Sequence, residues 1–174
     1  GTGAYTARRF AKAGYHIAMV ARDKNRLSNL ENEIPNSKGF TCDVSDLIRL
    51  QETCKQIKDL MGTPKILIHN AVKGNFEKLL EGKPEWLEEN FRINTTSLMY
   101  LAHALIPGMI KNKKGAIIIT GNTAAKRGVA NTPYFAPTKA AQRILAQSLA
   151  KDFGPKGIHA VSYTHLTLPT KDSV

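Results

Sequence analysis

Three short runs of consecutive apolar residues constrain the fold of this chain most strongly. Residues 17–20, 66–68 and 116–119 read IAMV, ILI and AIII, without the polar and apolar alternation of a half-exposed strand. Such runs are typical of strands that are buried on both faces, as in parallel sheets covered by helices on both sides. Phe40–Cys42 is a shorter candidate strand, and a further strand is expected near Ile158.

The segments between these runs have the periodicity of amphipathic helices. Leu50, Cys54 and Ile57 fall on one helical stripe, and Asp23 and Ser45 are expected to cap helices at their N-termini. Strand and helix in repetition imply parallel pairing with right-handed crossovers. The sequence therefore predicts an α/β fold, a doubly wound parallel sheet of the Rossmann type in a three-layer α/β/α sandwich.

The chain has 174 residues, which suits one domain, and we expect residues 1–160 to form a partial nucleotide-binding domain. In this architecture a central strand precedes the first glycine turn, whereas the sequence begins with Gly1. We therefore expect a fragment that lacks the first strand and the C-terminal part. Residues 161–170 resemble a translated sequencing adapter, so we expect residues 161–174 to be a non-native tail and assign them no function. The alternative is a genuine strand and tail.

Composition limits the classes of partner. The formal net charge is +11, but basic and acidic residues are interspersed and no nucleic-acid motif accompanies them, so we expect no nucleic-acid partner. No apolar run approaches the ~20 residues of a membrane span. The histidines are scattered, which argues against a metal site, and Cys42 and Cys54 are the only cysteines, which fits a cytoplasmic location.

A glycine turn at the start of the chain indicates a dinucleotide site. Gly1-Thr2-Gly3 is followed by a helical segment, whose N-terminus attracts phosphate while glycine permits close backbone approach. Arg22 follows the next strand, where the ribose is selected, and its planar cation suits the 2′-phosphate of NADP. Asp23 comes one residue later, so NAD is the alternative cofactor.

Taken together and in order, several short motifs give the chain a specific resemblance to the short-chain dehydrogenases/reductases. The motifs are Gly1-Thr2-Gly3, Cys42-Asp43-Val44, His69-Asn70-Ala71, Asn94 within residues 92–96, and Lys139-Ala140-Ala141. The resemblance runs from the glycine turn to about Ala160. It implies that Asp43 and Val44 line an adenine pocket and that Asn70 and Ala71 flank the cofactor, although helix entry and a strand-end turn are the alternative roles of Asp43 and Asn70.

The resemblance also implies a catalytic group around Lys139. Lys139 would bind the nicotinamide ribose and lower the pKa of a neighbouring tyrosine, because a free phenol titrates too high to act as a base near neutral pH. Asn94 would hold a water molecule of a proton relay.

Two positions depart from the family pattern. Phe135 stands four residues before Lys139, where the family has its acid/base tyrosine, and Phe135 cannot exchange a proton. Asn122, followed by Thr123, stands where a serine polarises the substrate carbonyl, and either residue can still donate a hydrogen bond. Tyr134 is the candidate substitute acid, although one residue along a helix turns a side chain by roughly 100°.

These observations predict an NAD(P)-dependent oxidoreductase of the short-chain type, which transfers hydride between NADP(H) and a small carbonyl or alcohol substrate at an atypical site. The alternative is an NADP-binding sensor or scaffold with impaired catalysis. By resemblance, we expect a homodimer or homotetramer.

Overall fold

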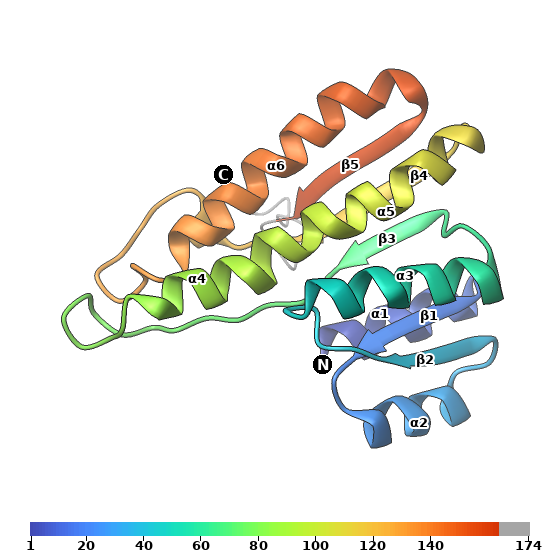
Figure 1. Ribbon diagram of the computed structural model, residues 1–174, viewed down its shortest axis with the longest axis horizontal. Coiled ribbons are helices and arrows are strands. Elements are labelled where there is room, and N and C mark those ends of the chain that lie inside the picture. The colour runs from blue at the N-terminus through green and yellow to red at the C-terminus, as the bar shows by residue number, and fades with distance from the viewer. Residues whose placement is uncertain (164–174) are drawn as a thin grey trace, which may run out of the picture.

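The computed structural model describes residues 1–163. Helices and strands alternate along the chain (Figure 1). Their order is α1 (Thr2–Lys12), β1 (Ile17–Ala21), α2 (Lys24–Glu33), β2 (Ser37–Thr41), α3 (Leu47–Met61), β3 (Ile66–His69), α4 (Glu85–Phe91), the π-helical turn η1 (Arg92–Thr96), α5 (Ser97–Lys111), β4 (Gly115–Thr120), η2 (Thr123–Ala125), α6 (Ala136–Phe153), η3 (Gly154–Lys156) and β5 (Ile158–Tyr163).

All strand pairs in the described residues are parallel. β1 pairs with β2, with Ile17 opposite Ser37, and β3, β4 and β5 form a second sheet in that order. The arrowheads point the same way in Figure 1, so the carboxyl ends of all five strands lie at one edge. The predicted α/β class with parallel strands and crossover helices is confirmed, and each apolar run singled out in the sequence lies in a strand.

Helices cover both faces of the strands. One core lies between β3, β4 and β5 and the helices α5 and α6, and its buried members are Leu67, Leu98, Ala102, Leu105, Ile106, Met109, Ile117, Ile119, Ala146, Leu149, Ile158 and Ala160. A second, smaller core joins β1 to α1 and α2 through Ala7, Met19, Leu27 and Ile34. Helix α3 packs beside α5 (Figure 1). The layers are thus helix, sheet and helix, as predicted.

Acidic side chains fix where two helices begin. The Asp23 carboxylate accepts a hydrogen bond from the backbone N–H of Arg26 at the start of α2, as predicted. The prediction for α3 was wrong by one residue, because Asp46 caps it by accepting from the N–H of Arg49. Ser45 instead donates its hydroxyl to Asp43. Asp23 lies two residues after the end of β1 and Asp46 five residues after the end of β2, so each cap fixes where the loop from the carboxyl edge ends.

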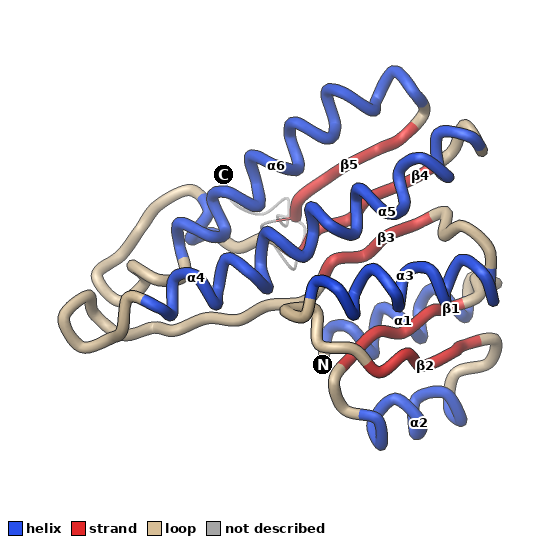
Figure 2. Tube along the Cα trace, viewed as in Figure 1, coloured by secondary structure: helices blue, strands red, loops and turns tan. Residues whose placement is uncertain are grey.

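Two long loops extend from the carboxyl edge. Figure 2 shows that the loop of residues 70–84, after β3, and the loop of residues 121–135, after β4, run past this edge beside the start of α6. Asn70, Asn122 and Thr123 lie at the starts of these two loops, and Lys139 lies near the start of α6.

Residues 161–163, at the start of the expected tail, belong to β5, and Val161 pairs with Ile118. The rest of that tail, residues 164–174, lies outside the described residues. No helix in the described part of the chain has both the length and the apolar character that crossing a membrane requires.

Candidate functional site at the carboxyl edge of the sheet

The glycine turn forms an open cradle at the N-terminus of α1. Gly1 occupies the cap position and offers no side-chain oxygen to the first N–H groups of this helix. A β-carbon added to Gly3 would lie 3.4 Å from the Asn70 amide nitrogen, so the turn passes close to the end of β3. The first N–H groups of α1 are therefore available to an anion beside Asn70.

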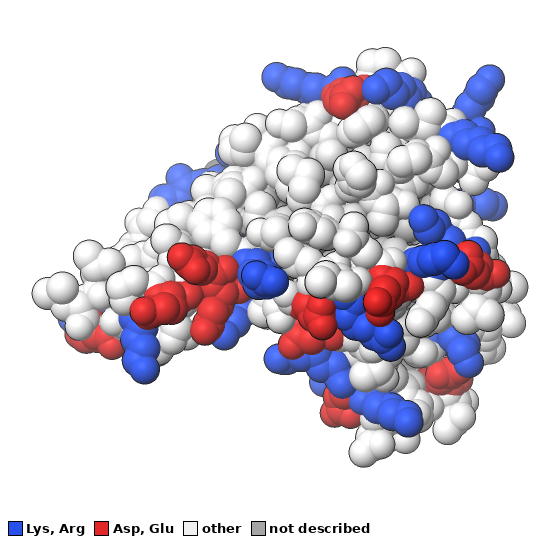
Figure 3. Space-filling model, viewed as in Figure 1, with Lys and Arg blue, Asp and Glu red and all other residues white. Residues whose placement is uncertain are grey.

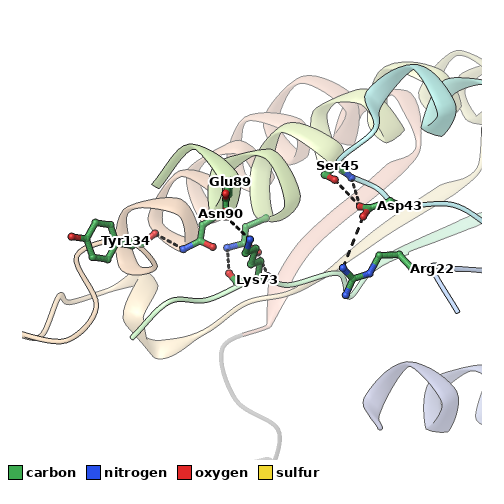
Figure 4. Close-up of polar contacts among 8 residues, drawn as sticks. Arg22, Asp43, Ser45, Lys73, Glu89, Asn90 and Tyr134 are labelled. Atoms are coloured by element: carbon green, nitrogen blue, oxygen red, sulfur yellow. Dashed lines mark hydrogen bonds and ion pairs between the residues drawn. The ribbon is translucent and has the colours of Figure 1, made fainter. Parts of the chain in front are cut away.

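Arg22 and Asp43 meet beyond the ends of β1 and β2. Nη1 of Arg22 lies 3.9 Å from Oδ2 of Asp43, and the Arg22 side chain is 77% exposed (Figure 4). The other Asp43 oxygen accepts hydrogen bonds from the backbone N–H and the hydroxyl of Ser45, at 2.9 and 2.7 Å. These bonds, chiefly the backbone one, hold the pKa of Asp43 below its usual range. Asp43 is thus an anion held by Ser45, with the exposed Arg22 guanidinium at the outer limit of ion-pair distance.

The remaining predicted cofactor residues lie between the cradle and β4. Val44 and Ala71 are half-buried directly after Asp43 and Asn70. The Asn70 side-chain oxygen accepts a hydrogen bond of 2.9 Å from the hydroxyl of Thr120, the last residue of β4. This bond ties the ends of the neighbouring strands β3 and β4 and leaves the Asn70 amide directed toward the glycine turn.

Lys139 is buried where β4 ends. Its side chain belongs to the second turn of α6, the residue is 2% exposed, and Nζ donates to the Thr120 carbonyl at 2.8 Å and to Oε1 of Gln142 at 2.6 Å. Burial lowers the pKa of Lys139 from its ordinary 10.5 to about 8. The amine therefore titrates near physiological pH, which makes it a functional-site candidate on physical grounds.

Asn94 lies inside the π-helical turn between α4 and α5 and is fully buried. Its side-chain oxygen accepts from the Lys73 N–H at 2.9 Å, and its amide donates to the Lys73 carbonyl and to the Thr138 hydroxyl, both at 2.8 Å. Single π turns within helices are frequent at functional sites. Here the turn presents Asn94 to both the loop after β3 and the start of α6.

Gln142 connects these two residues. Its Nε2 group donates to the Asn94 carbonyl at 2.5 Å and to Nδ1 of His69 at 3.1 Å, while its oxygen accepts from Lys139. The Ser97 hydroxyl donates its hydrogen to the Ile93 carbonyl. Nε2 of His69, which lies 2.9 Å from the same hydroxyl oxygen, is therefore the donor of that hydrogen bond. Burial, and secondly the Lys139 charge, lowers the pKa of His69 to about 4, so the ring is neutral.

Phe135 is at the cap position of α6, as its spacing from Lys139 requires. Its ring is 3% exposed and packs against Phe76, with ring centroids 5.0 Å apart. Its carbonyl accepts from the backbone N–H of Lys139. The position four residues before Lys139 is thus occupied by an apolar ring with a packing partner of its own.

Tyr134 is not directed to Lys139. Its hydroxyl donates to the Leu79 carbonyl at 2.5 Å, and its ring packs edge-on against Trp86. A β-carbon at Gly82 would clash with this ring, so the loop passes close over it. The ring points away from Asn90, whose amide holds the Tyr134 carbonyl (Figure 4). Tyr134 therefore has a structural partner where the sequence made it a candidate acid.

Asn122 and Thr123 follow β4 at the same edge. The Asn122 side-chain oxygen accepts from the Ala124 N–H at 2.8 Å and caps η2. Among the described residues its amide nitrogen has no hydrogen-bond partner, so it can donate outward. Thr123 is exposed.

The polar residues that connect the site were not assigned roles from the sequence. The signal for Gln142 was present, since it is a polar residue on the face of α6 that buries Ala146 and Leu149. His69 likewise ends an apolar strand. Pattern alone could not say that the two side chains meet, because they are far apart in the sequence.

A comparison with protein-family models now bears on this arrangement. The model described as short chain dehydrogenase matches residues 1–167. The chain belongs to the short-chain dehydrogenase family. L-xylulose reductase of Mesocricetus auratus is 27% identical over 159 residues, covering 91% of this chain and 64% of the relative. The chain thus spans somewhat less than two thirds of that short-chain dehydrogenase.

Solved structures agree with this membership. A metagenomic short-chain oxidoreductase in complex with NADP is 25% identical and superimposes with a TM-score of 0.91, over 96% of this chain and 78% of that one. A short chain oxidoreductase of Pseudomonas aeruginosa PAO1, described as containing an atypical catalytic center, is 24% identical with a TM-score of 0.86, over 94% and 65%. The latter shows the common fold.

We predict that Lys139 makes the free energy of unfolding pH-dependent. Its pKa is about 8 when folded, against about 10.5 in the unfolded chain, so between these pH values the unfolded chain binds more protons. Relative to Lys139→Met, the unfolding free energy should therefore rise by up to about 3 kcal/mol from pH 8 to 10.5, and stay level below pH 7. Urea unfolding at each pH measures this. If the difference in unfolding free energy between the unmodified chain and Lys139→Met did not change between pH 8 and 10.5, the lowered pKa of the buried amine would be contradicted.

Proposed function

We propose that this short-chain dehydrogenase binds NADP(H) along the carboxyl edge of its strands and transfers hydride between the coenzyme and a small carbonyl or alcohol substrate. The observation that carries the proposal is the buried Lys139 amine at the end of β4, which is connected to the glycine turn through Thr120 and Asn70. Family membership supports the reaction class, and the relative L-xylulose reductase is named for a small-molecule substrate.

The chain's own residues fit the coenzyme in three places. The uncapped N-terminus of α1, with Gly1, Thr2 and Gly3, suits the pyrophosphate. The exposed Arg22 suits a 2′-phosphate, and its hold on Asp43 is weak enough at 3.9 Å to be exchanged for a doubly charged group. NAD remains the alternative, because the neighbouring Asp43 carboxylate can accept from a ribose hydroxyl.

Asp43 and Val44 are assigned to the adenine end, whereas Asn70 and Ala71 are assigned to the middle of the coenzyme. Both pairs follow strands at the carboxyl edge, and the Asn70 amide already faces the glycine turn. Lys139 is assigned to the nicotinamide ribose, whose hydroxyl oxygens would accept from Nζ.

The bound nicotinamide supplies or accepts the hydride. The protein must orient the substrate carbonyl and control a proton. The free amide of Asn122, or the exposed hydroxyl of Thr123, would donate to the carbonyl oxygen. Neither of the two candidate positions in the described residues supplies a free phenol, since Phe135 lacks an exchangeable proton and the Tyr134 hydroxyl is bound to Leu79. Water would therefore deliver the proton, and loss of a general acid typically slows turnover 10²–10⁴-fold.

The packing of Phe135 and Tyr134 favours a second candidate function, an NADP-binding sensor or scaffold without turnover. The Phe135 ring is packed and Tyr134 is engaged elsewhere, while the residues assigned to coenzyme binding are intact. The two candidates share the binding step and differ only in whether bound NADPH is oxidised by a carbonyl compound.

Other partners and the location are proposals of the same kind. On the face drawn in Figure 3, basic and acidic side chains are interspersed, and acidic residues of α4 gather at one end, so that face offers no continuous basic surface to a nucleic acid.

Both cysteines are buried thiols, consistent with the cytoplasm. A homodimer or homotetramer is kept as the expected assembly. The described residues contain no cluster of ligating side chains suited to a metal ion.

We predict that Arg22→Ala weakens NADPH binding at least ~10-fold and leaves NADH binding within about 2-fold, because only the 2′-phosphate needs the guanidinium. Coenzyme fluorescence during titration of the full chain gives both affinities. Arg9→Ala is the matched control, since Arg9 is exposed in the last turn of α1. An equal loss for both coenzymes would remove Arg22 from the 2′-phosphate site.

We predict that Tyr134→Phe retains at least about half of any NADPH oxidation measured against a panel of carbonyl compounds, because this hydroxyl serves Leu79. Lys139→Met should reduce that rate at least ~100-fold. Absorbance decay of NADPH measures both variants, after circular dichroism confirms that they are folded. Activity abolished by Tyr134→Phe alone would show that the phenol reaches the substrate after all. Binding without any decay in the unmodified protein would favour the sensor.

A further inference from the structure

The carboxamide of Gln142 fills a small polar space in the core of the site. Three polar groups point at it, namely the amine of Lys139, the backbone carbonyl of Asn94 and Nδ1 of His69, at 2.6, 2.5 and 3.1 Å. Gln142 itself is fully buried. One donor and two acceptors around a buried point are the partners that an internal water molecule uses.

The orientation of this carboxamide is determined by its neighbours. The protonated Lys139 amine can only donate, so it requires the oxygen of Gln142. Both hydrogens of the Gln142 nitrogen are then used by the Asn94 carbonyl and by His69. Every polar atom of Gln142 is satisfied, and none is free to rotate.

A carboxamide differs from water in one chemical respect. Water can accept a proton from one neighbour and pass another proton on, whereas an amide held at both ends by fixed donors and acceptors cannot do so near neutral pH. Beyond Gln142, the series of hydrogen bonds continues from His69 to the Ser97 hydroxyl and from there to the Ile93 carbonyl. It therefore ends on a backbone group inside the protein.

We propose that Gln142 is a positioning residue that clamps Lys139 and occupies the place of a proton-carrying water, so that no proton can reach the buried amine through the protein interior. This inference rests on the proposed function, in which Lys139 faces the coenzyme. The site then lacks two things: a proton donor, because Phe135 has no exchangeable proton, and an internal proton supply, because Gln142 blocks it. A tyrosine restored at position 135 would therefore still lack an internal source of protons.

The first test measures Lys139 itself, without coenzyme. In the full chain labelled with ¹³C at the lysine ε-carbons, Gln142→Ala should admit water and return the Lys139 titration from near pH 8 to above pH 9, because hydration favours the ammonium. Lys139→Arg identifies the signal. Gln147→Ala is the matched control, since Gln147 is exposed on the same helix. An unchanged titration in Gln142→Ala would overturn the proposal.

The second test needs no substitution at Gln142. In the unmodified chain the side-chain amide protons of Gln142 should exchange with deuterated water at least ~100-fold more slowly than those of the exposed Gln147. The reason is that both amide protons of Gln142 are hydrogen-bonded and buried. Exchange at the rate of Gln147 would show that the clamp is open, and the proposal would fail.

The third test addresses proton supply. NADPH oxidation against the carbonyl panel should be at least ~10-fold faster for Phe135→Tyr combined with Gln142→Ala than for Phe135→Tyr alone, a gain that Gln142→Ala does not give by itself. Equal rates for the single and double variants would overturn the block. Failure of the unmodified chain to bind NADPH would instead contradict the proposed function, and the first two tests would still decide the role of Gln142.

Discussion

A buried amine at the end of β4 is the constraint on which the rest of the site depends. An ammonium group inside a protein is tolerated only where acceptors meet it, and two are fixed here, the Thr120 carbonyl and the Gln142 oxygen. The strand end, the start of α6 and the π turn at Asn94 must hold their relative positions for this to work. The parallel topology supplies them, because it brings the carboxyl ends of all the strands to one edge.

Phe135 and its neighbour Tyr134 are each held by local packing. Phe135 has an aromatic partner in Phe76, and the neighbouring Tyr134 is held by Leu79 and by the close approach of Gly82. A ring that packs in this way contributes to stability instead of leaving a cavity. The environment of Phe135 and Tyr134 is therefore formed by the loops of residues 70–84 and 121–135.

The fold could be predicted from the sequence because its signals are local. Apolar runs such as residues 116–119 mark buried parallel strands, and Asp23 marks the start of a helix through one hydrogen bond. The cap at α3 was missed because Ser45 and Asp46 are adjacent and equally suited, and the loop after β2 decides between them. The part of the site that lies along one helix could be predicted, because the spacing of Phe135 and Lys139 fixes their relative positions on α6. The partners of Gln142 were not, since His69 and Asn94 approach it from other elements and only tertiary packing brings them together.

The central claim is that this short-chain dehydrogenase keeps a working NADP(H) pocket although its usual proton donor is replaced. Isothermal titration calorimetry of the full-length protein with NADPH tests this most directly, because it detects binding whether or not turnover follows. The account predicts saturable heat with one coenzyme per chain and weaker binding of NADH. The absence of heat with both coenzymes, from a protein shown to be folded, would contradict it.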